Sequence, residues 1–206
     1  MNRRGLVCIT AGILLMLSAA GLTGYNIVDE RQAGEKAEHA YELLRDVSVK
    51  PGELELPEHI LPAYKVTPEV LMREIQIDGH AYIGYLSLPT LELDLPVMSE
   101  WSYPKMKIAP CRYWGSVYLD NMVIAAHNYV DHFGRLGSIA VGDPVIFTDV
   151  DGNVFEYTVS ELLQLNPNQT LNMVKGLDWD LTLFTCNASG RQRLTVRCVR
   201  TEKGVS

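Results

Sequence analysis

The stretch Leu-Thr-Leu-Phe-Thr-Cys at residues 181–186 is followed closely by Arg-Leu-Thr-Val-Arg at residues 193–197. Apolar and β-branched residues dominate the first stretch, which predicts a buried strand that ends at Cys186. Turn-forming residues occupy positions 187–190, and positions 192–199 alternate between polar and apolar as a second strand would. The two strands are therefore expected to fold back on each other and to bring an arginine beside the Cys186 sulfur.

A thiol beside a guanidinium suits nucleophilic attack on a carbonyl. The cation favours the thiolate, and it stabilises the oxyanion that develops during the attack. Period-two geometry places Arg191, Arg193 and Arg197 on one face of the second strand, so the alternation alone does not choose among them. Thr185 is compatible with a hydrogen bond to the sulfur or to a substrate, and equally with a plain β-branched strand residue.

A cysteine nucleophile also needs a proton shuttle, and the candidate is His127. It follows the apolar run 122–126, another predicted strand, and precedes Asn128, which either orients the imidazole or caps a turn. His132 and Asp131 lie close by and raise the question of a metal site. Their spacing matches neither a His-Glu-x-x-His helix nor paired Cys-x-x-Cys knuckles, so no metal and no other cofactor is expected.

This arrangement resembles the sortases, the membrane-anchored cysteine transpeptidases of bacterial cell envelopes. The resemblance rests on Ala-His-Asn at 126–128, the box at 182–186 and Arg193, and segment 82–89 is similar to the opening strand of the family. Ala126 stands where the family commonly has glycine. The resemblance implies that Cys186 is the nucleophile, His127 the proton shuttle and Arg193 the oxyanion-binding arginine.

The resemblance also implies an activity. A sortase cleaves a sorting motif on surface proteins through a cysteine thioester and transfers the acyl group to an amine of the cell envelope, from a peptidoglycan precursor or a pilin. Thr185 and Asn128 are then predicted to contact the substrate. The His-Asn pair and the helical N-terminal extension are similar to class B, and the short loop from Cys186 to Arg193 to class D, which leaves the class open.

Two other functions are compatible with the same residues. One is an envelope cysteine endopeptidase in which water resolves the thioester. The other is a membrane-anchored binding module that keeps the fold without activity. The net charge of -7 argues against a nucleic-acid partner, because such binding requires clustered lysine and arginine to neutralise phosphates.

The N-terminus carries a membrane signal. Arg3 and Arg4 precede an uncharged, mostly apolar run over residues 5–28. At about 1.5 Å per residue this run is long enough to cross a hydrocarbon core of about 30 Å and to contact membrane lipid. The positive charges predict a cytoplasmic N-terminus and an extracellular catalytic domain in a single-pass protein. The competing interpretation is a cleaved signal peptide, with small residues at 18–21 as its cleavage site.

The chain is expected to divide into an anchor at 1–28, a helical stalk and Pro-rich linker at 29–75, and a catalytic β-barrel at 76–206. Residues 29–47 have the spacing of an amphipathic helix, which either acts as a stalk or docks on the barrel. The prolines between 48 and 68 argue against regular structure there. Lys105, Lys107 and Arg135 are expected to be solvated charges.

The predicted fold is mostly β: a closed eight-stranded sortase-like barrel with short connecting helices. Asp151-Gly152 predicts a tight hairpin, and short helices are expected over 133–140 and 168–175. Cys111 and Cys198 either form a disulfide or are small buried hydrophobic residues, and Cys8 is expected to face lipid or another helix. The expected strands are 82–88, 91–97, 105–109, 122–126, 144–148, 154–163, 180–186 and 192–200.

Overall fold

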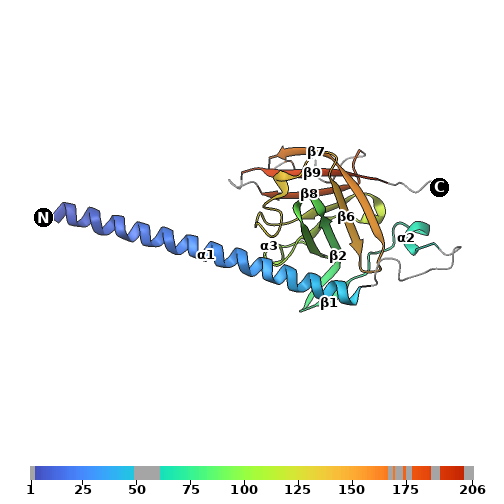
Figure 1. Ribbon diagram of the computed structural model, residues 1–206, viewed down its shortest axis with the longest axis horizontal. Coiled ribbons are helices and arrows are strands. Elements are labelled where there is room, and N and C mark those ends of the chain that lie inside the picture. Colours follow the sequence, from blue (N-terminus) through green and yellow to red (C-terminus); the bar gives the residue numbers. More distant parts are fainter. Residues whose placement is uncertain are drawn as a thin grey trace.

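A computed structural model describes residues 3–48, 61–166, 169, 174, 178–186 and 191–201. A β-barrel carries one long N-terminal helix that projects far beyond it (Figure 1). The helices are α1 (Arg3–Val47), α2 (Ala63–Val66) and α3 (Tyr103–Met106), with short 3-10 helices η1 (Pro89–Leu91), η2 (Val117–Leu119) and η3 (Leu136–Ser138). The strands are β1 (Ile75–Ile77), β2 (His80–Leu88), β3 (Leu93–Met98), β4 (Cys111–Trp114), β5 (Met122–Ala125), β6 (Pro144–Asp149), β7 (Val154–Leu165), β8 (Leu181–Cys186) and β9 (Arg193–Arg200).

Eight of these strands close into a barrel, as predicted. The order runs β2-β3-β4-β5-β8-β9-β7-β6, and β6 pairs back with β2. The short strand β1 pairs with the start of β2 and adds a ninth strand to the sheet without entering the closed ring. Most neighbours are antiparallel, but β3–β4 and β5–β8 are parallel. Closure leaves the ring with no free edge to recruit another chain.

One predicted strand is wrong. Residues 105–109, expected to be extended, instead form the end of α3 and the turn after it, and the third strand of the barrel along the chain is β4. The reason is local: the Ser102 side chain accepts a hydrogen bond from the Lys105 backbone N–H at 3.2 Å, and Pro104 lies in the first turn. Both features start a helix. The other seven predicted strands are confirmed with small shifts at their ends.

The shorter predicted elements had mixed outcomes. The hairpin at Asp151-Gly152 is confirmed, because β6 and β7 pair on either side of it. Within 133–140 only η3 forms. Most of 168–175 and the turn at 187–190 lie outside the described residues.

The linker between α1 and β1 contains more structure than its prolines predicted. Helix α2 forms at its C-terminal end. The ring of Tyr64 stacks on Tyr118 with centroids 4.7 Å apart, and it also contacts Phe155 at 5.3 Å. These contacts hold the segment against the barrel, because aromatic pairs add to the free energy gained by burial.

Two hydrophobic clusters support the fold. One fills the barrel and includes Leu181, Leu183 and Ile124. The other lies outside the ring, where Ala40 and Leu44 of α1 pack in one cluster with residues of the sheet. The buried residues Ala33, Ala37, Ala40 and Leu44 recur at helical spacing, so one face of α1 meets the barrel. The helix therefore docks on the barrel, which decides between the two arrangements that the sequence allowed.

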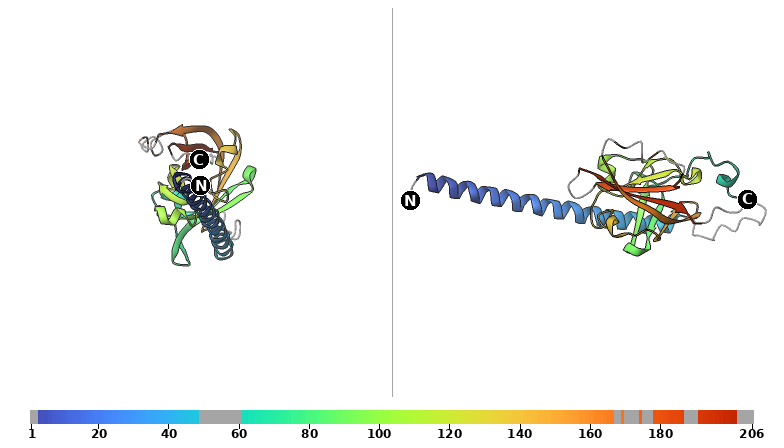
Figure 2. Two further views of the ribbon diagram at one scale, coloured as in Figure 1. Left: turned by 90° about the vertical axis from the view of Figure 1, so that its left-hand side faces the viewer. Right: turned by 90° about the horizontal axis from the view of Figure 1, so that it is seen from above.

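The first half of α1 has a different environment. Its large apolar side chains are exposed, and it extends away from the barrel in the right-hand view of Figure 2. Among the described residues α1 is the one helix long and apolar enough to cross a membrane, a property that signal sequences share. Cys8 is exposed on this segment, whereas Cys111 and Cys198 are buried free thiols in the barrel. The latter two therefore act as small hydrophobic residues, and no disulfide joins them.

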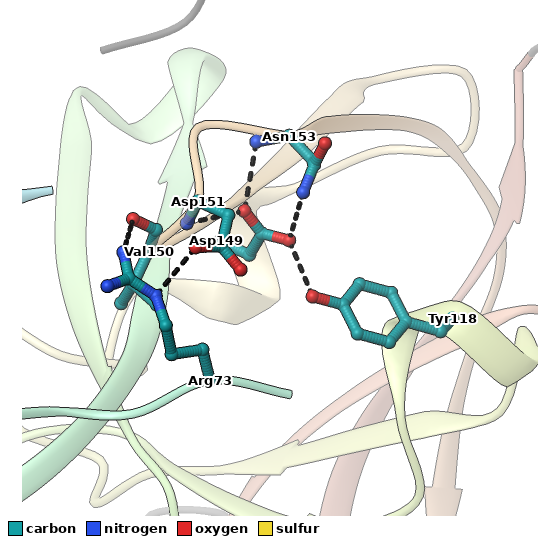
Figure 3. A network of polar contacts seen from close by, with 6 residues as sticks. All are labelled: Arg73, Tyr118, Asp149, Val150, Asp151 and Asn153. Carbon is teal, nitrogen blue, oxygen red and sulfur yellow. Dashed lines mark hydrogen bonds and ion pairs between the residues drawn. The ribbon is translucent and has the colours of Figure 1, made fainter. Parts of the chain in front are cut away.

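The turn between β6 and β7 is organised around one buried carboxylate, Asp149, which is 1% exposed. It accepts hydrogen bonds from the Tyr118 hydroxyl at 2.8 Å, the Asn153 side-chain amide at 2.8 Å and the backbone N–H groups of Asp151 and Asn153 at 2.9 Å. Arg73 pairs with Asp151 at 2.6 Å and donates to the Val150 carbonyl (Figure 3). Burial raises the pKa of Asp149, and the hydrogen bonds from Asn153 and Tyr118 oppose that rise.

Replacing Tyr118 by phenylalanine should destabilise the barrel by about 1.5–3 kcal/mol, the usual contribution of a hydrogen bond to a charged group. The ring would remain, and only the donor to Asp149 would be lost. Chemical denaturation followed by tryptophan fluorescence measures the difference. The matched control is Tyr103→Phe at a ring that is 63% exposed. Equal stabilities for the two variants would contradict a structural role for the Tyr118 hydroxyl.

Candidate active site

The parallel strands β5 and β8 end at the same edge of the sheet. Ala125 pairs with Phe184, and the next residue continues the ladder because the Ala126 N–H donates to the Phe184 carbonyl at 3.2 Å. His127 therefore follows the end of β5 at the level where Cys186 ends β8. Neighbouring strands lie about 4.8 Å apart, so this register brings residues His127 and Cys186 to neighbouring positions at one edge of the sheet.

Thr185 reinforces this alignment. Its hydroxyl donates to the Ala126 carbonyl at 2.9 Å, and the residue is 3% exposed. The bond ties the residue before the cysteine to the residue before the histidine. Thr185 therefore fixes the residue before Cys186 against the residue before His127.

The antiparallel neighbour β9 supplies the arginine. Cys186 pairs directly with Arg193, and the Arg193 guanidinium donates to the Cys186 sulfur at 3.0 Å. Arg197 lies further along the strand, where it pairs with Glu161 at 2.7 Å and covers the Trp179 ring at 3.6 Å. The structure thus places Arg193 at the sulfur.

The three groups share the outer face of the barrel. Alternate residues of β8 point inward to the barrel core, as Leu183 does, or outward to the cluster beneath α1, as Phe184 does. Cys186 has the parity of Phe184, and His127 has the parity of Ala125, which also belongs to the outer cluster. The helix α1 covers this same face.

The imidazole of His127 is half-buried and stacks on Tyr129, with ring centroids 4.9 Å apart and planes 24° apart. Burial lowers the pKa of His127 below its usual range, Lys107 lowers it further, and Asp29 acts in the opposite direction. The neutral imidazole is therefore favoured, and this form can accept a proton.

Three residues near the histidine escaped the sequence interpretation. Asp29 accepts hydrogen bonds from the Tyr129 hydroxyl at 2.7 Å and from Lys107 at 2.9 Å. Lys107 is a charge that remains partly exposed to solvent, as expected, and it is also the ion-pair partner of Asp29. Tyr129 lies two positions after His127, and this proximity in sequence only weakly indicated a contact between them. Nothing in the sequence connects Asp29 to Tyr129, which lies 100 positions away.

Within the described residues no group of three His, Cys, Asp or Glu side chains could hold a metal ion. His132 is fully buried instead. Burial lowers its pKa to about 4, although a backbone group of Ala33 in α1 favours the protonated form. Asn128 is exposed directly after His127.

The family model described as "Sortase domain" matches residues 86–201, more than half of the 206-residue chain. The chain belongs to the sortase family. The recognised domain contains His127, Cys186 and Arg193, and the sortase family implies cysteine transpeptidase activity. A search of curated proteins returned no match.

Solved sortases of several classes share the fold. A sortase D5 transpeptidase of Clostridium perfringens is 17% identical with a TM-score of 0.57, over 84% of this chain and 99% of that one. Sortase A of Corynebacterium diphtheriae is 17% identical with a TM-score of 0.55, over 91% and 97%. Sortase C1 of Streptococcus suis is 23% identical with a TM-score of 0.53, over 61% and 76%. At these identities the likeness shows the fold alone.

The buried His132 predicts a pH dependence of stability for this sortase. Its pKa in the folded state, about 4, lies below the unfolded value of 6.5, so protons bind the unfolded chain more tightly. Stability should be complete above pH 6.5 and decline toward pH 4, with a loss of roughly 2 kcal/mol by pH 5. His132→Gln should remove this part of the decline between pH 7.5 and pH 5, measured by denaturant titration.

The control is His39→Gln, at a side chain that is 61% exposed. It should keep the wild-type pH profile. A His132→Gln profile as steep as that of the wild type would show that His132 is not the group responsible.

Proposed function

We propose that this sortase is a membrane-anchored cysteine transpeptidase that acts on a sorting motif of surface proteins. His127 takes the proton of the Cys186 thiol, and the resulting thiolate attacks a backbone carbonyl of the motif. The resulting oxyanion is stabilised by Arg193, and His127 donates a proton to the departing amine. A thioester to Cys186 remains. An incoming amine then attacks the thioester, and His127 takes the amine proton and passes it to the departing Cys186 sulfur, which leaves a new amide and the free thiol.

The observation that supports this most directly is the 3.0 Å contact between the Arg193 guanidinium and the Cys186 sulfur, at the end of a strand paired with the strand of His127. A cationic donor at the nucleophile is well placed for the oxygen that becomes negative during attack. Asn128 is exposed beside His127 and remains our predicted substrate contact. The Thr185 hydroxyl donates its hydrogen to the Ala126 carbonyl, so any substrate contact must use the hydroxyl oxygen as an acceptor.

The substrate class is proposed from the family. Sortase C of Clostridium perfringens has been solved with a C-terminal cell wall sorting motif, at 21% identity and a TM-score of 0.54. We propose a related motif as acyl donor and an amine of a peptidoglycan precursor or a pilin as acceptor.

We further propose that residues 5–28 remain as a transmembrane anchor, with the N-terminus cytoplasmic and the barrel outside the cell. The exposed apolar side chains of this segment support contact with lipid. The docked second half of α1 would then hold the barrel at the membrane surface.

Mass spectrometry tests the reaction. The full chain in detergent micelles is incubated with a panel of sorting-motif peptides, with and without an amine such as triglycine. An acyl adduct on Cys186 and a ligated product are expected, and both should be lost in Cys186→Ala. Adduct followed only by hydrolysis would favour an endopeptidase. A folded chain that forms no adduct would favour the silent binding module.

Arg193→Ala should lower kcat by about 10²–10³, because one oxyanion donor is removed. Arg197→Ala is the matched control, since it is the same substitution on the same face of β9 but away from the sulfur. Peptide cleavage followed by chromatography measures both. Similar activities for the two variants would contradict the assigned role of Arg193.

A further inference from the structure

The N-terminal helix lies against the loop that begins at His127, and it touches three successive residues there. Asp29 accepts a hydrogen bond from the Tyr129 hydroxyl at 2.7 Å, and Glu30 accepts one from the Val130 backbone N–H at 2.6 Å. One turn further along α1, a β-carbon at Gly34 would come within 2.5 Å of the Asp131 carboxylate. The helix and the loop are therefore closely fitted along this contact.

The loop is also tightly folded in itself. The Phe133 N–H donates to the His127 carbonyl at 3.1 Å, and the Gly134 N–H donates to the Tyr129 carbonyl at 2.8 Å. Phe133 is fully buried in the barrel core. The backbone on either side of Tyr129 is thus fixed, and the direction of its side chain depends on what its hydroxyl contacts.

Tyr129 connects the helix to the histidine. Its ring stacks on the imidazole, and its hydroxyl is held by Asp29, which is held in turn by Lys107. Within the described residues the His127 imidazole makes no hydrogen bond or ion pair, and the stack on Tyr129 is its contact with a neighbouring ring.

We propose that Asp29 and Tyr129 are positioning residues for His127, and that the N-terminal helix is in this way a working part of the active site as well as its anchor. The proposal rests on the proposed role of His127 as proton shuttle. A shuttle must stay within hydrogen-bond reach of both the thiol and the amine, and misplacement by about 1 Å can cost about 10²-fold in rate.

Charged groups around His127 influence its pKa, so the pKa of the imidazole reports on whether Asp29 and Lys107 act on it. Asp29 comes from α1 and Lys107 from the segment after α3, while His132 and Tyr129 belong to the loop itself and Cys186 and Arg193 face it from β8 and β9. Asp29 favours the imidazolium form and Lys107 disfavours it. In the intact pair the two effects oppose each other, so removing either partner leaves the other acting alone.

Steady-state kinetics of the full chain in micelles test the positioning. Tyr129→Leu removes the stack and should lower kcat by about 10- to 100-fold with little change in KM. Tyr129→Phe keeps the stack but releases it from Asp29, and it should lower kcat less. Asp29→Asn should also lower kcat, whereas the matched control Asp46→Asn, on an exposed site of the same helix, should not.

Histidine-selective NMR titration gives a readout that a merely structural defect would not produce. Asp29→Asn should move the pKa of His127 down, and Lys107→Met should move it up. A general loosening of the loop would expose the ring in both variants and move both pKa values in the same direction. Opposite shifts would therefore support direct coupling of α1 to His127.

The outcomes separate this proposal from the proposed function. If no peptide forms a thioester, the reaction is refuted, but the NMR titration still reports on the coupling. Wild-type kcat in both Asp29→Asn and Tyr129→Leu would overturn the proposal, as would unchanged or equal pKa shifts in Asp29→Asn and Lys107→Met.

Discussion

The parallel pairing of β5 with β8 is the constraint on which the rest of the site depends. Parallel strands run in the same direction, so residues that follow corresponding positions emerge together at one edge of the sheet. Here the shared register ends at Ala125 and Phe184, and the next outward-facing residues are His127 and Cys186. A shift of one residue in either strand would turn one of these side chains into the barrel.

The antiparallel strand β9 completes this geometry from the other side. Every residue of β8 pairs with a residue of β9, and the last pair joins Cys186 to Arg193. Cys186 therefore lies between the strand that leads to His127 and the strand that carries Arg193. Strand pairing sets the positions of Cys186 and Arg193, whereas His127 opens the loop that follows β5.

The helix α1 adds a second layer to the outer face. Small residues let it approach the sheet closely, and Leu44 closes the cluster at its end. The same helix carries the exposed apolar segment at one end and Asp29 near its middle. One continuous element thus connects the membrane-spanning candidate to the surroundings of the histidine, because no break in α1 separates them.

The sequence by itself determined the strands β5, β8 and β9 and, through the resemblance, the eight-stranded barrel and the candidates His127, Cys186 and Arg193, because strand periodicity and a short motif are local properties. It misplaced the third strand of the barrel, since the cap at Ser102 outweighed the pattern at 105–109. Tertiary structure alone decided that Arg193 meets the sulfur, that α1 docks on the barrel, and that Asp29 contacts Tyr129 and Lys107. Those contacts join residues up to about 100 positions apart, and only the folded barrel brings such residues together.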